Sequence, residues 1–205
     1  MFPLPKPVLK KTSVDPEIPQ FKWEDLGDKE EIGRGSFGAV YRTSLGEKEL
    51  VVKKLFCAGD EDSQKEFLKE AKLMISLKHD NVVQLKAICL QPSAILSEFV
   101  YFDFQCFSDE TRVYNLAEFL RHVNRNYNCE GFTRVMPHIA ESVARGLQYL
   151  HSKDIVHRDV KPGNILVSNQ HYCSITEEKE FRDLWESRPI ICKLTYFGES
   201  KVPIK

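Results

Sequence analysis

The stretch HRDVKPGNILV, residues 157–167, carries the most specific pattern in the chain. It follows residues 135–151, where apolar side chains recur at helical spacing, and it runs into an apolar, strand-like segment. Asp159 can accept a proton from an incoming hydroxyl group, Lys161 can neutralise a phosphoryl group in transfer, and Asn164 can offer its amide oxygen to Mg²⁺. This pattern predicts a phosphoryl-transfer loop between a helix and a strand.

A glycine-rich segment, IGRGSFGAVYR, lies far upstream of that loop. Gly33, Gly35 and Gly38 form a GxGxxG array, which dinucleotide-binding folds also contain. In those folds the third glycine opens a helix, whereas residues 39–42 here continue as β-branched and aromatic strand. Without Cβ atoms the backbone can approach phosphate oxygens and offer N–H donors. The pattern favours a hairpin lying over phosphates, and a plain turn is the alternative.

A lysine on the next strand and an acid on the following helix form a candidate ion pair. In LVVKKLF, strand alternation sends Lys53 and Lys54 to opposite faces. Helical spacing over residues 61–78 places Glu70 beside the inward apolar stripe, with Glu66 one turn earlier. We expect Lys53 to pair with Glu70, and Lys54 and Glu66 are the alternatives.

The order of elements indicates the fold class. Strand-like runs begin after Trp23, and helical patterns dominate after residue 110. Further strands are expected at residues 82–89 and 94–102, and further helices at residues 115–123 and 135–151. Strands followed by helices predict an α+β chain with two lobes, with the ligand site between them.

In order and spacing, these motifs resemble the eukaryotic protein kinase family, of the serine/threonine type and most like its tyrosine-kinase-like branch. The resemblance covers residues 23 to about 200 and implies a five-stranded N-terminal lobe over a mainly helical C-terminal lobe, with ATP and Mg²⁺ between them. The implied domains are a proline-rich disordered tail at 1–22, the N-terminal lobe and hinge at 23–100, and a partial C-terminal lobe at 101–205.

The resemblance also implies roles for single residues. Asp159 would be the catalytic base, assisted by Lys161, while Asn164 would be a metal ligand. Lys53 would bind the α and β phosphates and Glu70 would hold Lys53. The positions that would contact the nucleotide are Ile32, Gly33, Arg34, Gly35, Ser36, Phe37, Gly38, Val40, Val51, Lys53, Glu98, Val100 and Leu166. Ser97 would be the gatekeeper, and the hydrophobic spine would comprise Met74, Leu85, His157 and Phe197.

The lysine of DVKPGN resembles serine/threonine kinases, since tyrosine kinases usually carry an arginine-containing, alanine-rich loop there, and this resemblance implies serine and threonine hydroxyls of proteins as substrates. One position departs from the family pattern, because KLTYFGES has Tyr196 where the family has an aspartate. A phenol that is neutral at pH 7 is a far poorer ligand for Mg²⁺ than a carboxylate. Loss of this carboxylate would lower the rate of phosphoryl transfer roughly a thousandfold or more. The alternative function is therefore a catalytically impaired pseudokinase, or a fragment, that acts as a nucleotide-binding or scaffolding module.

Two further departures concern the C-terminal lobe. Only ESKVPIK follows Gly198, so the activation segment and later helices are expected to be missing, and residues 168–189 look like an inserted loop. Within this loop, Phe181 and Trp185 recur at helical spacing behind an acidic start. We expect a helix that packs on its own lobe, with a docking surface as the alternative.

Composition limits the partners. The net charge of -1 gives no global basic field for nucleic acid or an anionic membrane. Six cysteines without a CxxC pair predict neither a zinc knuckle nor a disulfide framework, and they indicate a reducing, cytoplasmic or nuclear location. No apolar run approaches the roughly 18 residues of a membrane span. We expect ATP and a protein substrate or partner kinase as partners, and neither nucleic acid nor a membrane span.

Overall fold

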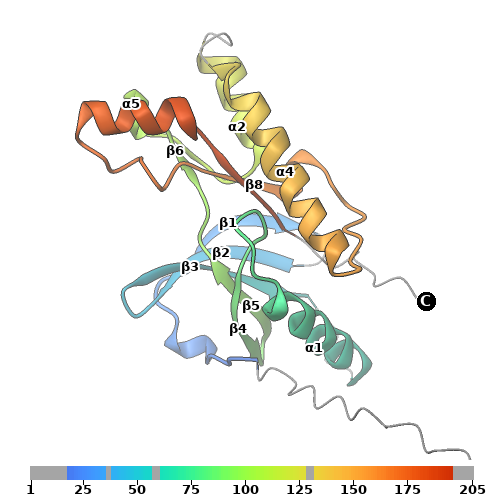
Figure 1. The fold of residues 1–205 in the computed structure, drawn as a ribbon. Coiled ribbons are helices and arrows are strands. Elements are labelled where there is room, and N and C mark those ends of the chain that lie inside the picture. Colours follow the sequence, from blue (N-terminus) through green and yellow to red (C-terminus); the bar gives the residue numbers. More distant parts are fainter. Residues whose placement is uncertain (1–17, 36–37, 57–60, 128–131, 196–205) are drawn as a thin grey trace, which may run out of the picture.

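A five-stranded antiparallel sheet forms the first half of the molecule. The computed structural model describes residues 18–35, 38–56, 61–127 and 132–195. The strands, in sheet order, are β1 (Glu30–Gly35), β2 (Gly38–Leu45), β3 (Lys48–Leu55), β5 (Ser93–Glu98) and β4 (Leu85–Leu90) (Figure 1). The predicted α+β architecture with a five-stranded N-terminal lobe is therefore confirmed.

Helix α1 (Glu61–Ser76) packs on one face of this sheet. Its inward stripe consists of Phe67, Ala71 and Met74, which are buried in one cluster with Ile88 of β4 and Ile95 of β5. The spacing of three and four residues that predicted the helix is thus the spacing of its buried side chains.

The opposite face of the sheet has an apolar cluster of its own. Leu50 and Val52 of β3 are buried there with Leu96 of β5. Phe21 and Leu26, from the segment before β1, belong to the same cluster. Because β3 packs on both faces, its alternate side chains enter different surroundings.

The segment before β1 also pairs with the edge of the sheet. Phe21 N donates to Ile88 O at 3.0 Å, and Ile88 N donates to Pro19 O at 2.9 Å. The structure therefore differs from the expected tail of residues 1–22 at its last residues, where burial of Phe21 and pairing of the β4 edge fix the chain. The earlier part of the tail lies outside the described residues.

Shorter strands and the remaining helices form the second half. They are β6 (Phe102–Asp103), the 3₁₀ helix η2 (Phe104–Phe107), β7 (Arg112–Val113), α2 (Leu116–Asn126), α4 (Val135–Ser152), the 3₁₀ helix η3 (Pro162–Asn164), β8 (Ile165–Ser168), α5 (Glu178–Ser187) and β9 (Ile191–Leu194). Strand β6 pairs with β7 and β8 pairs with β9, both antiparallel. The helices predicted over residues 115–123 and 135–151 are α2 and α4.

Helix α2 begins at a reciprocal side-chain cap. Asn115 Oδ1 accepts a hydrogen bond from Glu118 N at 3.0 Å, and Asn115 Nδ2 donates to Glu118 Oε1 at 2.8 Å. The second carboxylate oxygen of Glu118 accepts from Tyr114 N at 2.9 Å. The first of these bonds satisfies a backbone donor that the first helical turn leaves without a partner, and the other two hold the residues just before the helix. The sequence YNLAE therefore fixes where α2 starts.

Helix α4 and β9 meet at a glycine. A β-carbon on Gly146 would lie 2.7 Å from Asn81 O and 2.9 Å from Leu194 Cδ1. Strand β9 also pairs with the segment between α1 and β4, because Leu194 N donates to Asn81 O at 2.9 Å and Val83 N donates to Leu194 O at 3.0 Å. Strand β9 thus joins α4 to the N-terminal half of the molecule.

Helix α5 is the helix expected within residues 168–189, and its aromatic side chains pack on the second half of the molecule. The ring centroid of Trp185 lies 5.0 Å from that of Phe107 and 5.7 Å from that of Phe132. Phe181 is 6.2 Å from Phe107. The aromatic face of α5 therefore packs against its own lobe, which is the simpler of the two expectations for this helix.

Two hydrogen bonds connect Asn169, which directly follows β8, to strand β6. Asp103 N donates to Asn169 Oδ1, and Asn169 Nδ2 donates to Asp103 O, both at 2.8 Å. Both residues are buried, and Arg112 Nε donates to Asp103 Oδ2 at 2.7 Å. Together with the aromatic contacts of α5, these bonds make the segment after β5 and the segment after β8 one packed unit.

The described part of the chain has no helix long and apolar enough to cross a membrane. Four of its cysteines are free thiols: Cys89, Cys106, Cys173 and Cys192.

The Gly146→Ala variant tests the contact between α4 and β9. A methyl group at this position would overlap the carbonyl of Asn81, so we expect the free energy of unfolding to fall by about 1–3 kcal/mol, although alanine favours helices. Urea denaturation followed by circular dichroism measures this change. In the control variant Gly163→Ala no atom lies within 4 Å of the added carbon, and a loss of equal size there would contradict the assignment.

Candidate functional site

Lys53 and Lys54 leave β3 on opposite faces of the sheet. Lys53 lies opposite Val40 of β2 and Ile95 of β5, so its side chain shares the face that α1 covers. Lys54 Nζ instead lies 5.6 Å from the ring centroid of Trp23, on the other face. The register therefore gives only Lys53 access to the side of the sheet on which α1 lies.

Glu70 of α1 interacts electrostatically with Lys53. Burial raises the pKa of the Glu70 carboxyl above its ordinary value, and the positive charge of Lys53 opposes that rise. The two side chains are thus close enough for their charges to interact, and the ion pair between them stays a prediction. The side chain of the alternative partner, Glu66, lies outside the described residues.

The glycines of the β1–β2 hairpin differ in the space that a β-carbon would find. Gly38 is required by the protein itself, because a β-carbon there would lie 2.3 Å from Lys54 O. For Gly33 the nearest atom to such a carbon is Val40 Cβ at 3.9 Å, and for Gly35 there is none within 4 Å. Packing within the described chain therefore explains the third glycine and leaves the first two open toward a ligand.

The other hairpin positions predicted to contact the nucleotide are Ile32, Arg34, Ser36 and Phe37. Ile32 is half-buried, and Arg34 forms an ion pair with Glu31 on the surface. Ser36 and Phe37, which the sequence placed among the nucleotide contacts, lie outside the described residues.

Three apolar side chains expected around an adenine are half-buried: Val40 of β2, Val51 of β3 and Leu166 of β8. Val51 lies opposite Ser97 of β5, and Ser97 Oγ donates to Val51 O at 3.5 Å. Cross-strand register places Val40, Val51 and Ser97 on the same face as Lys53. This face of the sheet therefore combines apolar surface with one lysine.

In the hinge expected at residues 98–100, the carboxylate of Glu98 accepts hydrogen bonds from two other segments of the chain. Lys193 Nζ of β9 donates to Glu98 Oε1 at 2.9 Å and to Glu98 Oε2 at 3.0 Å. Gln84 N, just before β4, donates to Glu98 Oε1 at 2.8 Å. Val100 is buried. Sequence reasoning missed Lys193, because no motif distinguishes it from an ordinary lysine on a strand.

His157 anchors the loop that follows α4. It is buried, its Nε2 donates to Thr195 O at 3.0 Å, and Asp159 N donates to its Nδ1 at 3.3 Å. Burial lowers the pKa of His157, and these two bonds fit the neutral imidazole with its proton on Nε2. Arg158, which lies between His157 and Asp159, has a φ of 67°, a left-handed conformation that non-glycine residues rarely adopt. The chain is thus bent sharply between His157 and Asp159.

Asp159, Lys161 and Asn164 form one hydrogen-bonded cluster. Asp159 Oδ2 accepts from Asn164 Nδ2 at 2.7 Å and from Lys161 Nζ at 2.8 Å, and Asp159 O accepts from Asn164 Nδ2 at 2.9 Å. The hydrogen bond from Lys161 is the largest effect that holds the pKa of Asp159 below its ordinary value. Asp159 is therefore a carboxylate at neutral pH, about one-third exposed.

The same bonds determine what Asn164 can offer to a cation. Its amide nitrogen is used twice by Asp159, so its amide oxygen is the group that suits a hard cation. The described residues contain no group of three or more His, Cys, Asp and Glu side chains that could bind a metal ion. Tyr196, which replaces the expected aspartate, and the spine residue Phe197 lie outside the described residues. Among the described residues, Asn164 is thus the one predicted metal ligand, and its amide oxygen fits that role.

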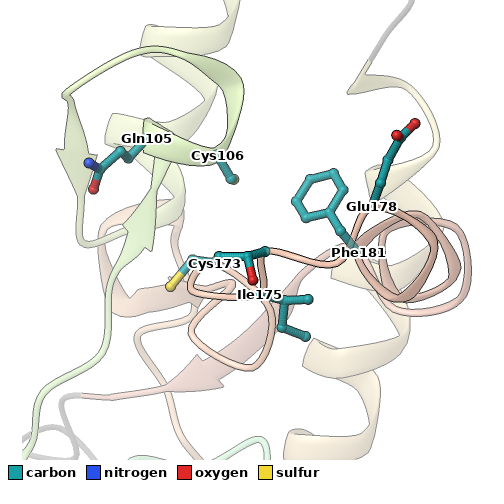
Figure 2. A pocket seen from close by; sticks show the side chains of 7 residues that line it. Gln105, Cys106, Cys173, Ile175, Glu178 and Phe181 are labelled. Carbon is teal, nitrogen blue, oxygen red and sulfur yellow. The ribbon is translucent and has the colours of Figure 1, made fainter.

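A surface cavity of about 290 Å³ lies away from these residues, between η2 and α5 (Figure 2). Cys106 and Cys173 line it, with Phe181 on its α5 side. Burial is the main cause that raises the pKa of Cys173 and that raises the pKa of Cys106 to about 12. Both thiols are therefore protonated at neutral pH, and neither is an activated nucleophile.

Comparison with known proteins agrees with the motifs. The family model described as "Protein tyrosine and serine/threonine kinase" matches residues 26–188. Among similar proteins, the tyrosine-protein kinase transforming protein Abl of Abelson murine leukemia virus is 30% identical over 180 residues, which is 84% of this chain and 22% of that protein. PTI1-like tyrosine-protein kinase 2 of Arabidopsis thaliana is 27% identical over 183 residues, 84% of this chain and 49% of that protein.

A probable LRR receptor-like serine/threonine-protein kinase of Arabidopsis thaliana is 29% identical over 149 residues, which is 71% of this chain and 14% of that protein. The chain thus spans half or less of the length of these relatives.

A double-mutant cycle on Glu98 and Lys193 tests the hinge contact. Both side chains are at most one-quarter exposed, so we expect a coupling free energy of about 1–2 kcal/mol, between the values for exposed and buried pairs. Urea denaturation of Glu98→Gln, Lys193→Met and the double variant measures it. Arg182 and Glu178 on α5, an exposed ion pair, serve as the control cycle. Coupling no larger than in that control would contradict a hinge-fixing role.

Proposed function

The chain belongs to the protein tyrosine and serine/threonine kinase family, and we propose that it binds ATP and transfers the γ-phosphate to serine and threonine hydroxyls of proteins. The observation that carries this proposal is the cluster of Asp159, Lys161 and Asn164, in which a partly exposed carboxylate is held by a lysine and an amide.

The β1–β2 hairpin and β3 would bind the nucleotide. Gly33 and Gly35 leave room for phosphate oxygens to approach the backbone, and Lys53 lies on the neighbouring strand with Glu70 to orient it. The half-buried apolar face of Val40 and Val51 would contact adenine, opposite Leu166. The backbone at residues 98–100 would supply the hydrogen bonds to its edge.

In the proposed reaction, Asp159 accepts the proton of the substrate hydroxyl while that oxygen forms a bond to the γ-phosphorus. The bond between the γ-phosphorus and the oxygen that bridges it to the β-phosphate breaks, and ADP leaves. Lys161 lies 2.8 Å from Asp159 and would stabilise the charge on the phosphoryl group in transfer. The family uses Mg²⁺ with ATP, and the amide oxygen of Asn164 would hold that ion, which supplies further neutralisation of the phosphate charges.

The preference for serine and threonine rests on Lys161. Tyrosine-specific members of the family usually carry an arginine-containing loop at this place. The similar proteins include kinases named for tyrosine and for serine/threonine. Lys161 lies within hydrogen-bond distance of Asp159, which favours the serine/threonine assignment.

A second candidate function is nucleotide binding without efficient transfer. Tyr196 favours it, because this position would otherwise provide the principal carboxylate ligand for Mg²⁺. Gly33, Gly35 and Lys53 do not depend on that ligand. A chain of this kind would act as a nucleotide-dependent scaffold or as the partner of another kinase.

Phosphate transfer from labelled ATP to a mixture of serine, threonine and tyrosine peptides tests the first candidate. We expect weak transfer by the chain, an increase of roughly a thousandfold in Tyr196→Asp, and loss of that gain when Asp159→Ala is added. Asp183→Ala, an exposed aspartate on α5, is the matched control and should leave the rate unchanged. Absence of transfer by Tyr196→Asp would refute the assignment of Asp159 as the base.

Thermal unfolding with nucleotide separates the two candidates. Saturating ATP should raise the melting temperature by several degrees, since about 100 times Kd of ligand adds about 2.7 kcal/mol of stability. Lys53→Met should abolish the shift, whereas Lys54→Met, its neighbour on the opposite face, should retain it. A shift without detectable transfer, even in Tyr196→Asp, would favour the second candidate. No shift with any nucleotide would exclude both.

A further inference from the structure

A second surface cavity, of about 260 Å³, lies between β7 and α2. One wall is a single stripe of α2, which consists of Glu118, Arg121, His122, Arg125 and Asn126. These positions are separated by three, four, seven and eight residues, so they project from one side of the helix. The other wall is Arg112 and Val113 of β7. We call this cavity the α2 groove.

The acidic groups at the α2 groove already have partners. The carboxylate of Glu118 accepts hydrogen bonds from Tyr114 N and Asn115 Nδ2 as part of the helix cap. His122 Nε2 lies 2.8 Å from Asp109 Oδ2, which also accepts from Tyr127 OH at 3.1 Å. Neither carboxylate is directed to an arginine of the groove.

The arginines of the α2 groove have N–H donors that a ligand can use. Arg112 uses its Nε for the buried Asp103, and a guanidinium group carries four further N–H donors. Arg121 and Arg125 are exposed, and neither forms an ion pair with any residue that the structure describes. Two exposed guanidinium groups thus lie one turn apart on α2, and Arg112, which is paired with Asp103 and lies 4.8 Å from the ring centroid of Tyr101, faces them from β7.

The spacing of these arginines suits an extended peptide. Arg121 and Arg125 are four residues apart, a rise of about 6 Å along the helix axis. Alternate side chains of an extended chain point the same way and recur about every 6.6 Å. Two acidic side chains separated by one residue therefore match the spacing of the two guanidinium groups, each of which can bind a carboxylate with two hydrogen bonds.

The position of the α2 groove connects it to the phosphoryl-transfer loop. Helix α2 packs against η3, which includes Asn164. The cap residue Asn115 also forms an isolated bridge to Leu166, and Val167 N donates to Tyr114 O at 3.2 Å. A peptide held on the outer side of α2 would thus be anchored to the element that positions Asp159 and its partners.

From these observations we infer that the α2 groove binds an acidic segment of a protein substrate, in extended conformation, with two carboxylate side chains separated by one residue. This inference names the substrate class and therefore rests on the proposed phosphotransferase function. Charge complementarity selects the occupant: Arg121 and Arg125 line the groove without an ion-pair partner among the described residues, while Arg112 is paired with Asp103 and the carboxylates of Glu118 and Asp109 are directed to the helix cap and to His122.

Fluorescence anisotropy with labelled peptides tests the inference directly. The full chain should bind a peptide that contains Glu-Ala-Glu at least tenfold more tightly than the same peptide with Gln-Ala-Gln, and its affinity should fall as salt is raised. Arg121→Gln combined with Arg125→Gln should weaken binding at least tenfold. Lys179→Gln combined with Arg182→Gln, on α5, changes the net charge equally and should leave binding within twofold.

Charge reversal provides a gain of binding that misfolding cannot imitate. Arg121→Glu combined with Arg125→Glu should lose the Glu-Ala-Glu peptide and bind a Lys-Ala-Lys peptide instead. Equal binding of the Glu and Gln peptides, or unchanged binding by the Arg121 and Arg125 variants, would overturn the inference. A tenfold preference for a phosphoserine peptide over Glu-Ala-Glu would also overturn it, since the occupant would then be a phosphorylated segment.

The ATP-dependent melting shift measured on the same samples distinguishes the two proposals. Peptide binding without any nucleotide response would refute the proposed function and leave an acidic-peptide groove. A nucleotide response without peptide binding would refute only the groove.

Discussion

The backbone of Leu194 connects the two halves of this molecule, and most of the candidate site depends on that connection. Its N–H donates to Asn81 O and its carbonyl accepts from Val83 N, so β9 is paired with the segment that leads into the sheet. Gly146 allows α4 to approach the same point. Lys193, one residue earlier, reaches the carboxylate of Glu98. Strand β9 therefore positions the sheet, Glu98 at the end of β5, and α4 relative to one another.

The loop of residues 157–164 depends on this arrangement through Thr195, the residue that follows Leu194. Thr195, which follows β9, accepts a hydrogen bond from His157 and donates to Asn164 O. The two ends of the loop are thus held to the same backbone. The cluster of Asp159, Lys161 and Asn164 lies between these fixed ends, so its geometry is set by buried backbone pairing and not by its exposed side chains alone.

Sequence reasoning succeeded where local periodicity or a specific motif determines the outcome. Strand alternation separated Lys53 from Lys54, and helical spacing identified the buried stripe of α1. It failed where a contact joins distant segments. Nothing in the local sequence around Lys193 or Asn169 indicates that these residues bind Glu98 and Asp103, because only the tertiary fold brings such partners together. The last residues of the expected tail were missed for a similar reason, since Phe21 is ordered by the sheet edge and not by its proline-rich neighbours.

The two kinds of glycine in the β1–β2 hairpin bear on how such a chain changes over generations. A substitution at Gly38 would collide with the backbone of β3 in any chain with this sheet, whether or not a nucleotide is bound. At Gly33 and Gly35 the fold itself would accept a side chain. Over generations the sheet therefore constrains only the third of these positions, and only a ligand over the hairpin would constrain the first two.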